Sequence, residues 1–155
     1  MLSSSHLHAM VIHFPIALLM AGFLSEILAL FRNRFFFHQA AFYLLLLGTL
    51  GSIIAYVTGN AAGEGMEEGE LAKAIQLHEQ AATLTLWLTV TTAITYVSIY
   101  FFQVKRTWTN VLCLLLFTGV IGSVARTGYL GGQLVYKHGA GVELTLPDFS
   151  GSSEK

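Results

Sequence analysis

The chain contains four long stretches in which apolar residues follow one another almost without interruption. Each is long enough to cross the roughly 30 Å of hydrocarbon in a bilayer, which takes about 20 helical residues. Apolar runs of this length are typical of transmembrane helices. The predicted spans run from 9 to 31, 35 to 58, 81 to 102 and 109 to 129. The pattern therefore predicts an all-α membrane protein, a four-transmembrane-helix bundle at residues 1–142 with a polar C-terminal tail at 143–155.

The composition supports a membrane protein and excludes several classes of function. Of the 155 residues, 54% are hydrophobic and 11% are charged, whereas a soluble domain has about 25% charged residues. The net charge of −1 and the absence of a basic stripe argue against a nucleic-acid partner. Cys113 is the one cysteine and lies inside an apolar run. A disulfide framework, a CxxC metal site and covalent haem attachment through CxxCH are therefore excluded.

Basic residues mark the two short links between the predicted spans. Arg32 and Arg34 lie between the first two spans, and Lys105 and Arg106 lie between the last two, whereas the acidic stretch EGMEEGE lies on the other side. Positive loops face the cytoplasm. We therefore expect a protein of the bacterial inner membrane with both termini in the periplasm. The first span should be retained, because the positive residues follow it instead of preceding it as in a secretory signal.

Most of the histidines are expected at one depth, on the periplasmic side. Counted outward from the basic links, four rings fall near the outer edge of the hydrocarbon: His8, His13, His78 and His138. Ionisable groups in or beside the hydrocarbon are costly and usually functional, so we expect at least two of them to bind a cofactor or metal. His6 and His38 are expected to be solvated. Arg126, near the same edge, either anchors its helix at the interface or holds a haem propionate.

Helix geometry limits how these rings can be combined. His8 and His13 are five residues apart, which separates them by about 140° in direction and 7.5 Å along a helix, so they cannot both ligate one iron. A b-type haem takes two axial imidazoles from facing helices. A copper or zinc ion would need three or four rings within about 2.0–2.1 Å of it. The spacing of the histidines leaves both kinds of site open.

Two parts of the sequence resemble one another. LGTLGSIIAYVTGNAAG in the second span is similar to FTGVIGSVARTGYLGG in the fourth, and Leu7 with His8 recurs as Leu77 with His78. The chain then consists of two repeated helical hairpins related by an axis along the membrane normal, unless the likeness is a coincidence of glycine-rich apolar sequence. The small residues on one face of each helix indicate close helix packing or room for a flat macrocycle beside a histidine.

The segments HAMVIHFPIALL and RTGYLGGQLVYKHGAGV, together with a histidine at the head of the third helix, resemble a known family. This is the bacterial four-helix membrane family called domain of unknown function 2231. The chain departs from the family pattern at Ala9, where the family tends to have proline, and at Tyr129, where it often has histidine. Tyr129 is therefore given no ligand role. Members of the family often accompany cytochrome or Rieske-type domains, so the resemblance implies electron transfer.

We accordingly expect an integral membrane electron-transfer subunit similar to a small b-type cytochrome, a redox carrier subunit more than a stand-alone enzyme. It would bind one or two haem b groups through His8, His13, His78 and His138, with Arg126 nearby. The expected partners are membrane lipid, a periplasmic cytochrome c or Rieske-type protein, a quinone, or a larger respiratory complex. The alternatives are a histidine-built copper or zinc site, and a cofactor-free assembly subunit of a larger membrane complex.

The predicted orientation can be tested with reporter fusions. Fusions after Arg34 and Lys105 should report the cytoplasm, because basic links are retained there, and fusions near Met66 and at the C-terminus should report the periplasm. A phosphatase reporter active only outside the cytoplasm and a fluorescent protein active only inside it give opposite signals at each position. The reversed pattern would place the four outer histidines in the cytoplasm and contradict the assignment.

Overall fold

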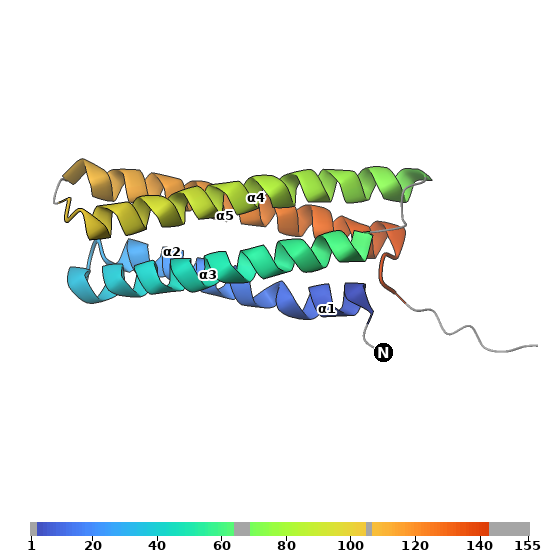
Figure 1. Cartoon of the computed structure of the whole chain (residues 1–155), viewed down its shortest axis with the longest axis horizontal. Coiled ribbons are helices and arrows are strands. Elements are labelled where there is room, and N and C mark those ends of the chain that lie inside the picture. The colour runs from blue at the N-terminus through green and yellow to red at the C-terminus, as the bar shows by residue number, and fades with distance from the viewer. Residues whose placement is uncertain (1–2, 64–68, 105–106, 143–155) are drawn as a thin grey trace, which may run out of the picture.

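The computed structural model of the chain describes residues 3–63, 69–104 and 107–142. Its elements are α1 (Ser4–Val11), α2 (His13–Leu28), α3 (Arg34–Gly63), α4 (Gly69–Phe101) and α5 (Thr107–His138), and the described ranges contain no strand. Because α1 and α2 form one span together, four helical segments are long and apolar enough to cross a membrane. The expected all-α four-helix bundle is confirmed (Figure 1). The polar tail at 143–155 lies outside the described residues.

Several helices continue beyond the predicted membrane spans. α4 begins at Gly69, well before the predicted start at 81, and α5 continues to His138, past the predicted end at 129. Charged residues at these ends suit the helix dipole: Glu70 lies in the first turn of α4, and Lys137 lies in the last turn of α5. As a consequence, His78 and His138 lie on helices and not in loops.

The helices are arranged as two hairpins lying side by side. The most extensive contacts join α2 to α3 and α4 to α5, and contacts of α3 with α4 and of α2 with α5 close the bundle. The links from α2 to α3 and from α4 to α5 lie at one end of the molecule, whereas the N-terminus and the end of α5 lie at the other (Figure 1). This arrangement agrees with the expected pair of hairpins, and the side of the membrane that each end faces stays a prediction.

A one-residue interruption at Ile12 separates α1 from α2. Pro15 lies one turn further on, and a proline inside a helix lacks an N–H and its ring crowds the carbonyl four residues before it, here that of Val11. The Pro15 side chain is buried against α3, where a Cβ added at Gly51 would lie 3.2 Å from it. The HFP motif therefore sets the angle at which α1 continues along α3.

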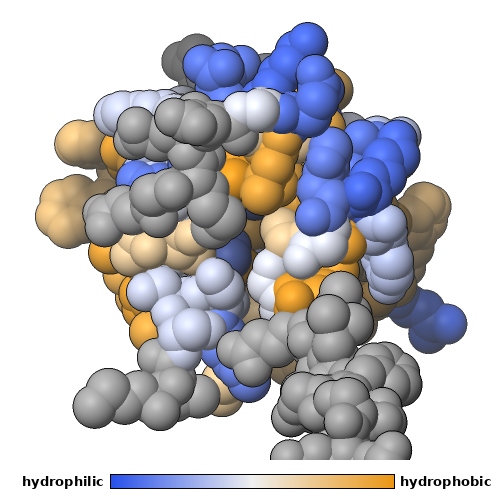
Figure 2. Space-filling model, turned by 90° about the vertical axis from the view of Figure 1, so that its right-hand side faces the viewer, coloured by the Kyte–Doolittle hydropathy of each residue, from blue (hydrophilic) through white to orange (hydrophobic). Residues whose placement is uncertain are grey.

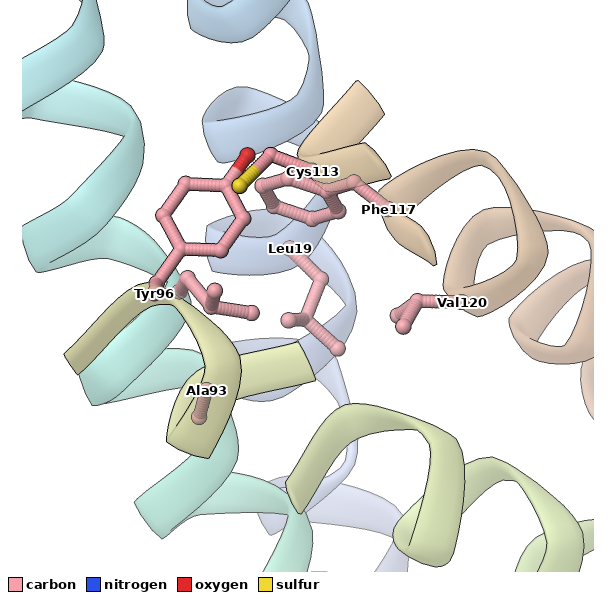
Figure 3. Packing of buried hydrophobic residues seen from close by; sticks show 7 residues of the cluster. Leu19, Ala93, Tyr96, Cys113, Phe117 and Val120 are labelled. Atoms are coloured by element: carbon pink, nitrogen blue, oxygen red, sulfur yellow. The ribbon is translucent and has the colours of Figure 1, made fainter. Parts of the chain in front are cut away.

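The centre of the bundle is a cluster of buried side chains from four helices (Figure 3). Its members are Leu19, Leu45, Ala93, Tyr96, Cys113, Phe117 and Val120. Two buried threonines of α4 satisfy their hydroxyls within the helix, because Thr89 donates to the Thr85 carbonyl and Thr92 to the Leu88 carbonyl, each at 2.7 Å. Many large apolar side chains are exposed around the bundle, as expected where lipid tails cover it.

The small residues of α3 and of α5 are used differently. On α3, a Cβ added at Gly48 would lie 2.8 Å from the Leu19 side chain, so this glycine is needed for the close approach of α2. The small face of α3 thus serves close helix packing. The glycines of α5 that the sequence repeat matches to those of α3 would meet no atom within 4 Å: Gly119, Gly122, Gly128 and Gly132. That face of α5 points away from the bundle.

Replacing Gly48 by alanine should lower the free energy of unfolding relative to replacing Gly119 by alanine. Both variants gain helix propensity of about 1 kcal/mol, but only a Cβ at position 48 would displace Leu19. Overpacking of this kind typically costs about 1–3 kcal/mol, so the free energy of unfolding should be lower for Gly48→Ala than for Gly119→Ala by that amount. Unfolding by denaturing detergent in mixed micelles measures it. Equal stabilities would show that α2 does not approach α3 as closely as described.

Candidate functional site

The ring of His8 is held against α3. Its Nδ1 lies 3.2 Å from the Thr58 hydroxyl oxygen, and the Thr58 hydroxyl donates its proton to the Ile54 carbonyl at 3.0 Å. The Thr58 oxygen therefore accepts a hydrogen bond from the His8 Nδ1–H, and the carbonyl of Ala55 lies beside the ring as a further acceptor. This network assigns the proton of the neutral ring to Nδ1, which leaves Nε2 as the nitrogen able to bind a metal.

The ring of His78 is held against α5 in a similar way. Its Nδ1 lies 3.1 Å from the Thr127 carbonyl oxygen. Because a carbonyl only accepts, Nδ1 carries the proton and Nε2 is again free to ligate. The hydroxyls of Thr127 and Thr85 are 2.9 Å apart, which joins α5 to α4 beside the ring. The sequence repeat includes Thr127, and Thr85 lies on the small face of its helix, but neither threonine was predicted to take part in a site, since a threonine facing a neighbouring helix has no signature of its own.

A glycine lies beneath each of the two rings. A Cβ added at Gly59 would lie 2.9 Å from the His8 ring, and one added at Gly131 would lie 3.1 Å from the His78 ring. Real Cβ atoms are essentially never found below 3.0 Å, and 3.1 Å is tighter than nine in ten contacts. Glycine therefore lets each ring approach the helix backbone closely enough to reach a main-chain carbonyl.

The two rings lie at matching positions on their neighbouring helices. Nδ1 of His8 lies against Thr58 and Nδ1 of His78 against Thr127, and the sequence repeat matches these two threonines to one another. This supports the internal repeat. The glycines beneath the rings do not follow the same match, because the repeat pairs Gly59 with Gly128, which is open to the outside, whereas Gly131 lies under His78.

His8 and His78 lie at the same end of the bundle on helices that do not touch. No Cα atom of α1 lies within 8 Å of one in α4, yet the two half-buried rings are close enough for their charges to interact. Neither Nε2 has a hydrogen-bond partner within the described ranges. Figure 2 shows this end of the molecule, where hydrophilic and hydrophobic surface lie side by side.

The other expected site residues are exposed at the surface of the bundle. His13 is exposed on α2, and its Nδ1 bonds to the Ala9 carbonyl of its own chain segment at 2.7 Å. His138 and Arg126 are exposed on α5. Among the residues that the structure describes, no group of three or more His, Cys, Asp or Glu side chains could hold a metal ion. The structure therefore brings together two of the four histidines and adds no third ring to them.

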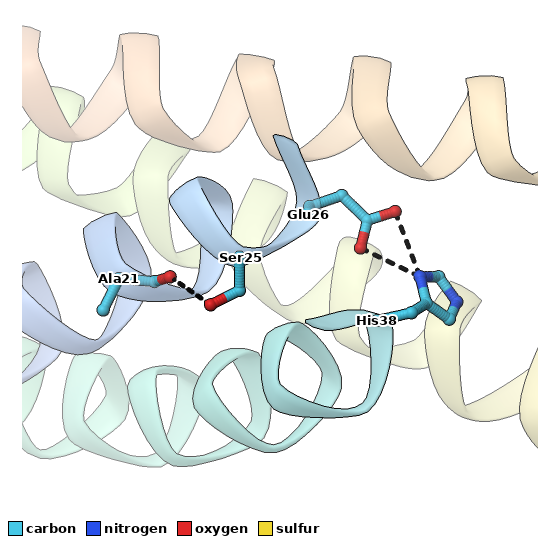
Figure 4. Close-up of polar contacts among 4 residues, drawn as sticks. All are labelled: Ala21, Ser25, Glu26 and His38. Atoms are coloured by element: carbon cyan, nitrogen blue, oxygen red, sulfur yellow. Dashed lines mark hydrogen bonds and ion pairs between the residues drawn. The ribbon is translucent and has the colours of Figure 1, made fainter. Parts of the chain in front are cut away.

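A second polar cluster, at the opposite end of the bundle, differs from the sequence expectation. Glu26 on α2 is only 4% exposed, and its two carboxylate oxygens lie 2.9 and 3.2 Å from Nδ1 of His38 on α3 (Figure 4). The expectation that His38 is solvated is wrong: the ring is half-buried and its Nδ1 contacts the Glu26 carboxylate. The reason is that a carboxylate facing the interior of a membrane bundle needs a partner. Glu26 within an apolar span was the available signal.

Comparison with known proteins places the whole bundle in one family. Residues 4–144 match the family described as "Predicted membrane protein (DUF2231)", which covers all five helices. No curated protein and no solved structure is significantly similar to the chain. Because the match extends over almost the entire chain, the protein belongs to the DUF2231 family of membrane proteins.

Proposed function

We propose that the chain is an electron-transfer subunit of the bacterial inner membrane, with one haem b held between His8 and His78. The observation that carries this proposal is the state of the two rings. Each has its Nδ1–H engaged by an acceptor on a neighbouring helix and its Nε2 free. Histidines that ligate metals almost always have this arrangement, because the second hydrogen bond fixes the tautomer and the direction of the ring.

A pair of histidine rings fits a haem better than a bare metal ion. A haem iron already has four ring nitrogens and takes two further ligands, one from each side. Two imidazoles on helices whose backbones stay apart match this requirement. A closed zinc or copper site needs three or four protein ligands, and the described residues offer no such group. Non-covalent binding follows from the sequence, since Cys113 is the one cysteine and is buried among apolar side chains.

The residues around the pair have separate parts in this proposal. A bound haem would supply one-electron exchange between the ferric and ferrous states. Thr58 and the Thr127 carbonyl orient the rings, and the surrounding helices limit the access of water. Arg126, next to Thr127 in the chain, adds a positive charge near the site and raises the cost of the oxidised iron. His13 and His138 remain as candidate ligands of a second haem.

The orientation and the partners belong to the same proposal. The basic links support a periplasmic position for the His8 and His78 end, where a cytochrome c or a Rieske-type protein would exchange electrons with it. A quinone or a larger respiratory complex would be the partner within the membrane. A second candidate function, assembly of a larger complex, is favoured by the open glycine face of α5, which would admit a further helix closely.

The absorption spectrum of the purified protein tests the haem directly. The reduced protein should show the α-band of a bis-histidine b haem, and acid acetone should extract the haem because nothing anchors it covalently. His8→Ala and His78→Ala should each abolish or greatly weaken the band, since each removes one axial ligand. Arg126→Ala should keep the band and lower the midpoint potential, because the oxidised iron is then less disfavoured.

His6→Ala is the matched control for this experiment. His6 is exposed near the same end of the chain, so its loss should leave the band unchanged. Bound copper or zinc in a colourless protein would replace the haem proposal by a metal site. A protein with neither cofactor would favour the assembly role.

The glycine under His78 provides a second test. Gly131→Ala should displace the ring from the Thr127 carbonyl, and loss of such an orienting contact typically weakens metal affinity by about 10–100-fold. Gly128→Ala on the same helix is the control, because a Cβ there meets nothing within 4 Å. Haem titration of the apoprotein measures both affinities. Equal affinities of the two variants would mean that the contact of His78 with the Thr127 carbonyl does not orient a ligand.

A further inference from the structure

A cavity of about 210 Å³ lies at the opposite end of the bundle from His8 and His78. It opens between α3 and α4, and Cys113 of α5 contributes to its wall. In Figure 1 this is the end that carries the links from α2 to α3 and from α4 to α5. The principal lining residues are His38, Gln39, Phe42, Tyr96, Ile99 and Gln103. None of them is used by the proposed haem site.

Aromatic rings form much of the wall and are stacked in pairs. The rings of His38 and Tyr96 lie 5.8 Å apart with 27° between their planes. The rings of Phe42 and Tyr100, which also line the cavity, lie 5.2 Å apart at 20°. Aromatic walls favour a ligand with a flat ring, because such a ring stacks on them with large contact area.

Polar groups at the cavity are available for hydrogen bonds. Nδ1 of His38 contacts Glu26, so Nε2 is the nitrogen of this ring that can form a hydrogen bond with a ligand in the cavity. The side-chain amide of Gln39 has no hydrogen bond to another described residue. The Tyr96 hydroxyl is buried beside Glu26 and Cys113, so Tyr96 contributes its ring to the wall and not its hydroxyl. A ring that carries oxygen atoms would therefore find hydrogen-bonding partners here.

The charge of the lining favours a neutral ligand. Within residues 3–63, 69–104 and 107–142, no lysine or arginine lines the cavity. The buried carboxylate of Glu26 lies directly behind His38, where it would repel an anion. The cavity is formed by membrane-spanning helices, so a ligand that dissolves in the bilayer can approach it from the side. Its occupant is thus expected to be flat, neutral, lipid-soluble and able to accept hydrogen bonds.

We propose that this cavity binds the headgroup of a lipid-soluble quinone. A cavity of about 150 Å³ holds a benzene ring, so the volume here admits one six-membered ring with small substituents. The choice of a quinone among neutral rings rests on the proposed electron-transfer function. Binding itself does not depend on the haem, since His38 and Thr58 lie about 30 Å apart along α3.

Equilibrium dialysis of duroquinone against the full chain in nanodiscs tests the inference. Duroquinone has no free ring position for addition of the Cys113 thiol, and durene is the same methylated ring without the two carbonyl oxygens. Duroquinone should bind saturably at one per chain, in excess of its partition into empty nanodiscs. Durene should compete at least tenfold more weakly, because it cannot accept a hydrogen bond.

Two variants of α4 locate the binding. Ile99→Trp fills the cavity and should weaken duroquinone binding more than tenfold, whereas Ile94→Trp adds the same side chain on the exposed face of α4 and should leave it within twofold. Gln39→Leu should weaken binding without disturbing the Glu26 and His38 pair. Equal competition by durene, equal binding by the two tryptophan variants, or no saturable binding at all would overturn the inference.

The same measurement separates this inference from the haem proposal. In His78→Ala, which should lack haem, duroquinone should still bind with unchanged affinity, because the cavity lies at the other end of the bundle. A protein that binds duroquinone but never haem would refute the haem proposal and retain the quinone site. A protein that binds haem but not duroquinone would refute the quinone site and retain the haem proposal.

Discussion

Close contact between α3 and the first membrane span is the interaction on which the rest of the bundle depends. Lipid tails are as apolar as leucine side chains, so transmembrane helices gain little by burying apolar surface and associate through close packing instead. Gly48 and Gly51 let Leu19 and Pro15 reach the α3 backbone. The same contact brings α1 alongside the end of α3, where Gly59 receives His8. The position of the candidate ligand thus follows from how the helices pack.

The histidines at the two ends of the bundle have different hydrogen-bond partners. At one end, His8 and His78 bond to neutral oxygen acceptors and keep one nitrogen free. At the other, Nδ1 of His38 lies 2.9 Å from the buried carboxylate of Glu26. The neutral acceptors at the first end leave Nε2 as the nitrogen that can bind a metal, whereas at the second end the ring is the polar partner that a buried carboxylate needs. Residues of one type therefore support different chemistry, depending on the nearest acceptor.

The fold was predictable from the sequence, whereas the site was predictable only in part. Apolar runs of about 20 residues define four spans whatever their partners are, and the recurrence of Leu7 and His8 at 77 and 78 indicated two histidines in equivalent positions. Sequence spacing could not show that His13 faces outward, because rotation of a helix is set by its neighbours. For the same reason it predicted no contact of Thr127 and Gly131 with His78. The pair of Glu26 and His38 joins different helices, and only the folded bundle brings them together.

The interruption of the helix before Pro15 lets α1 open separately from α2. Among the described helices, α1 contacts α3 and α2, and it contributes none of its side chains to the buried core. A short helix of this kind can open locally at much lower free energy than the whole bundle. Amide hydrogens of α1 should then exchange with solvent faster than those of α2. Any ligand of His8 would slow this exchange, so that the N-terminal turns would report occupancy of the site.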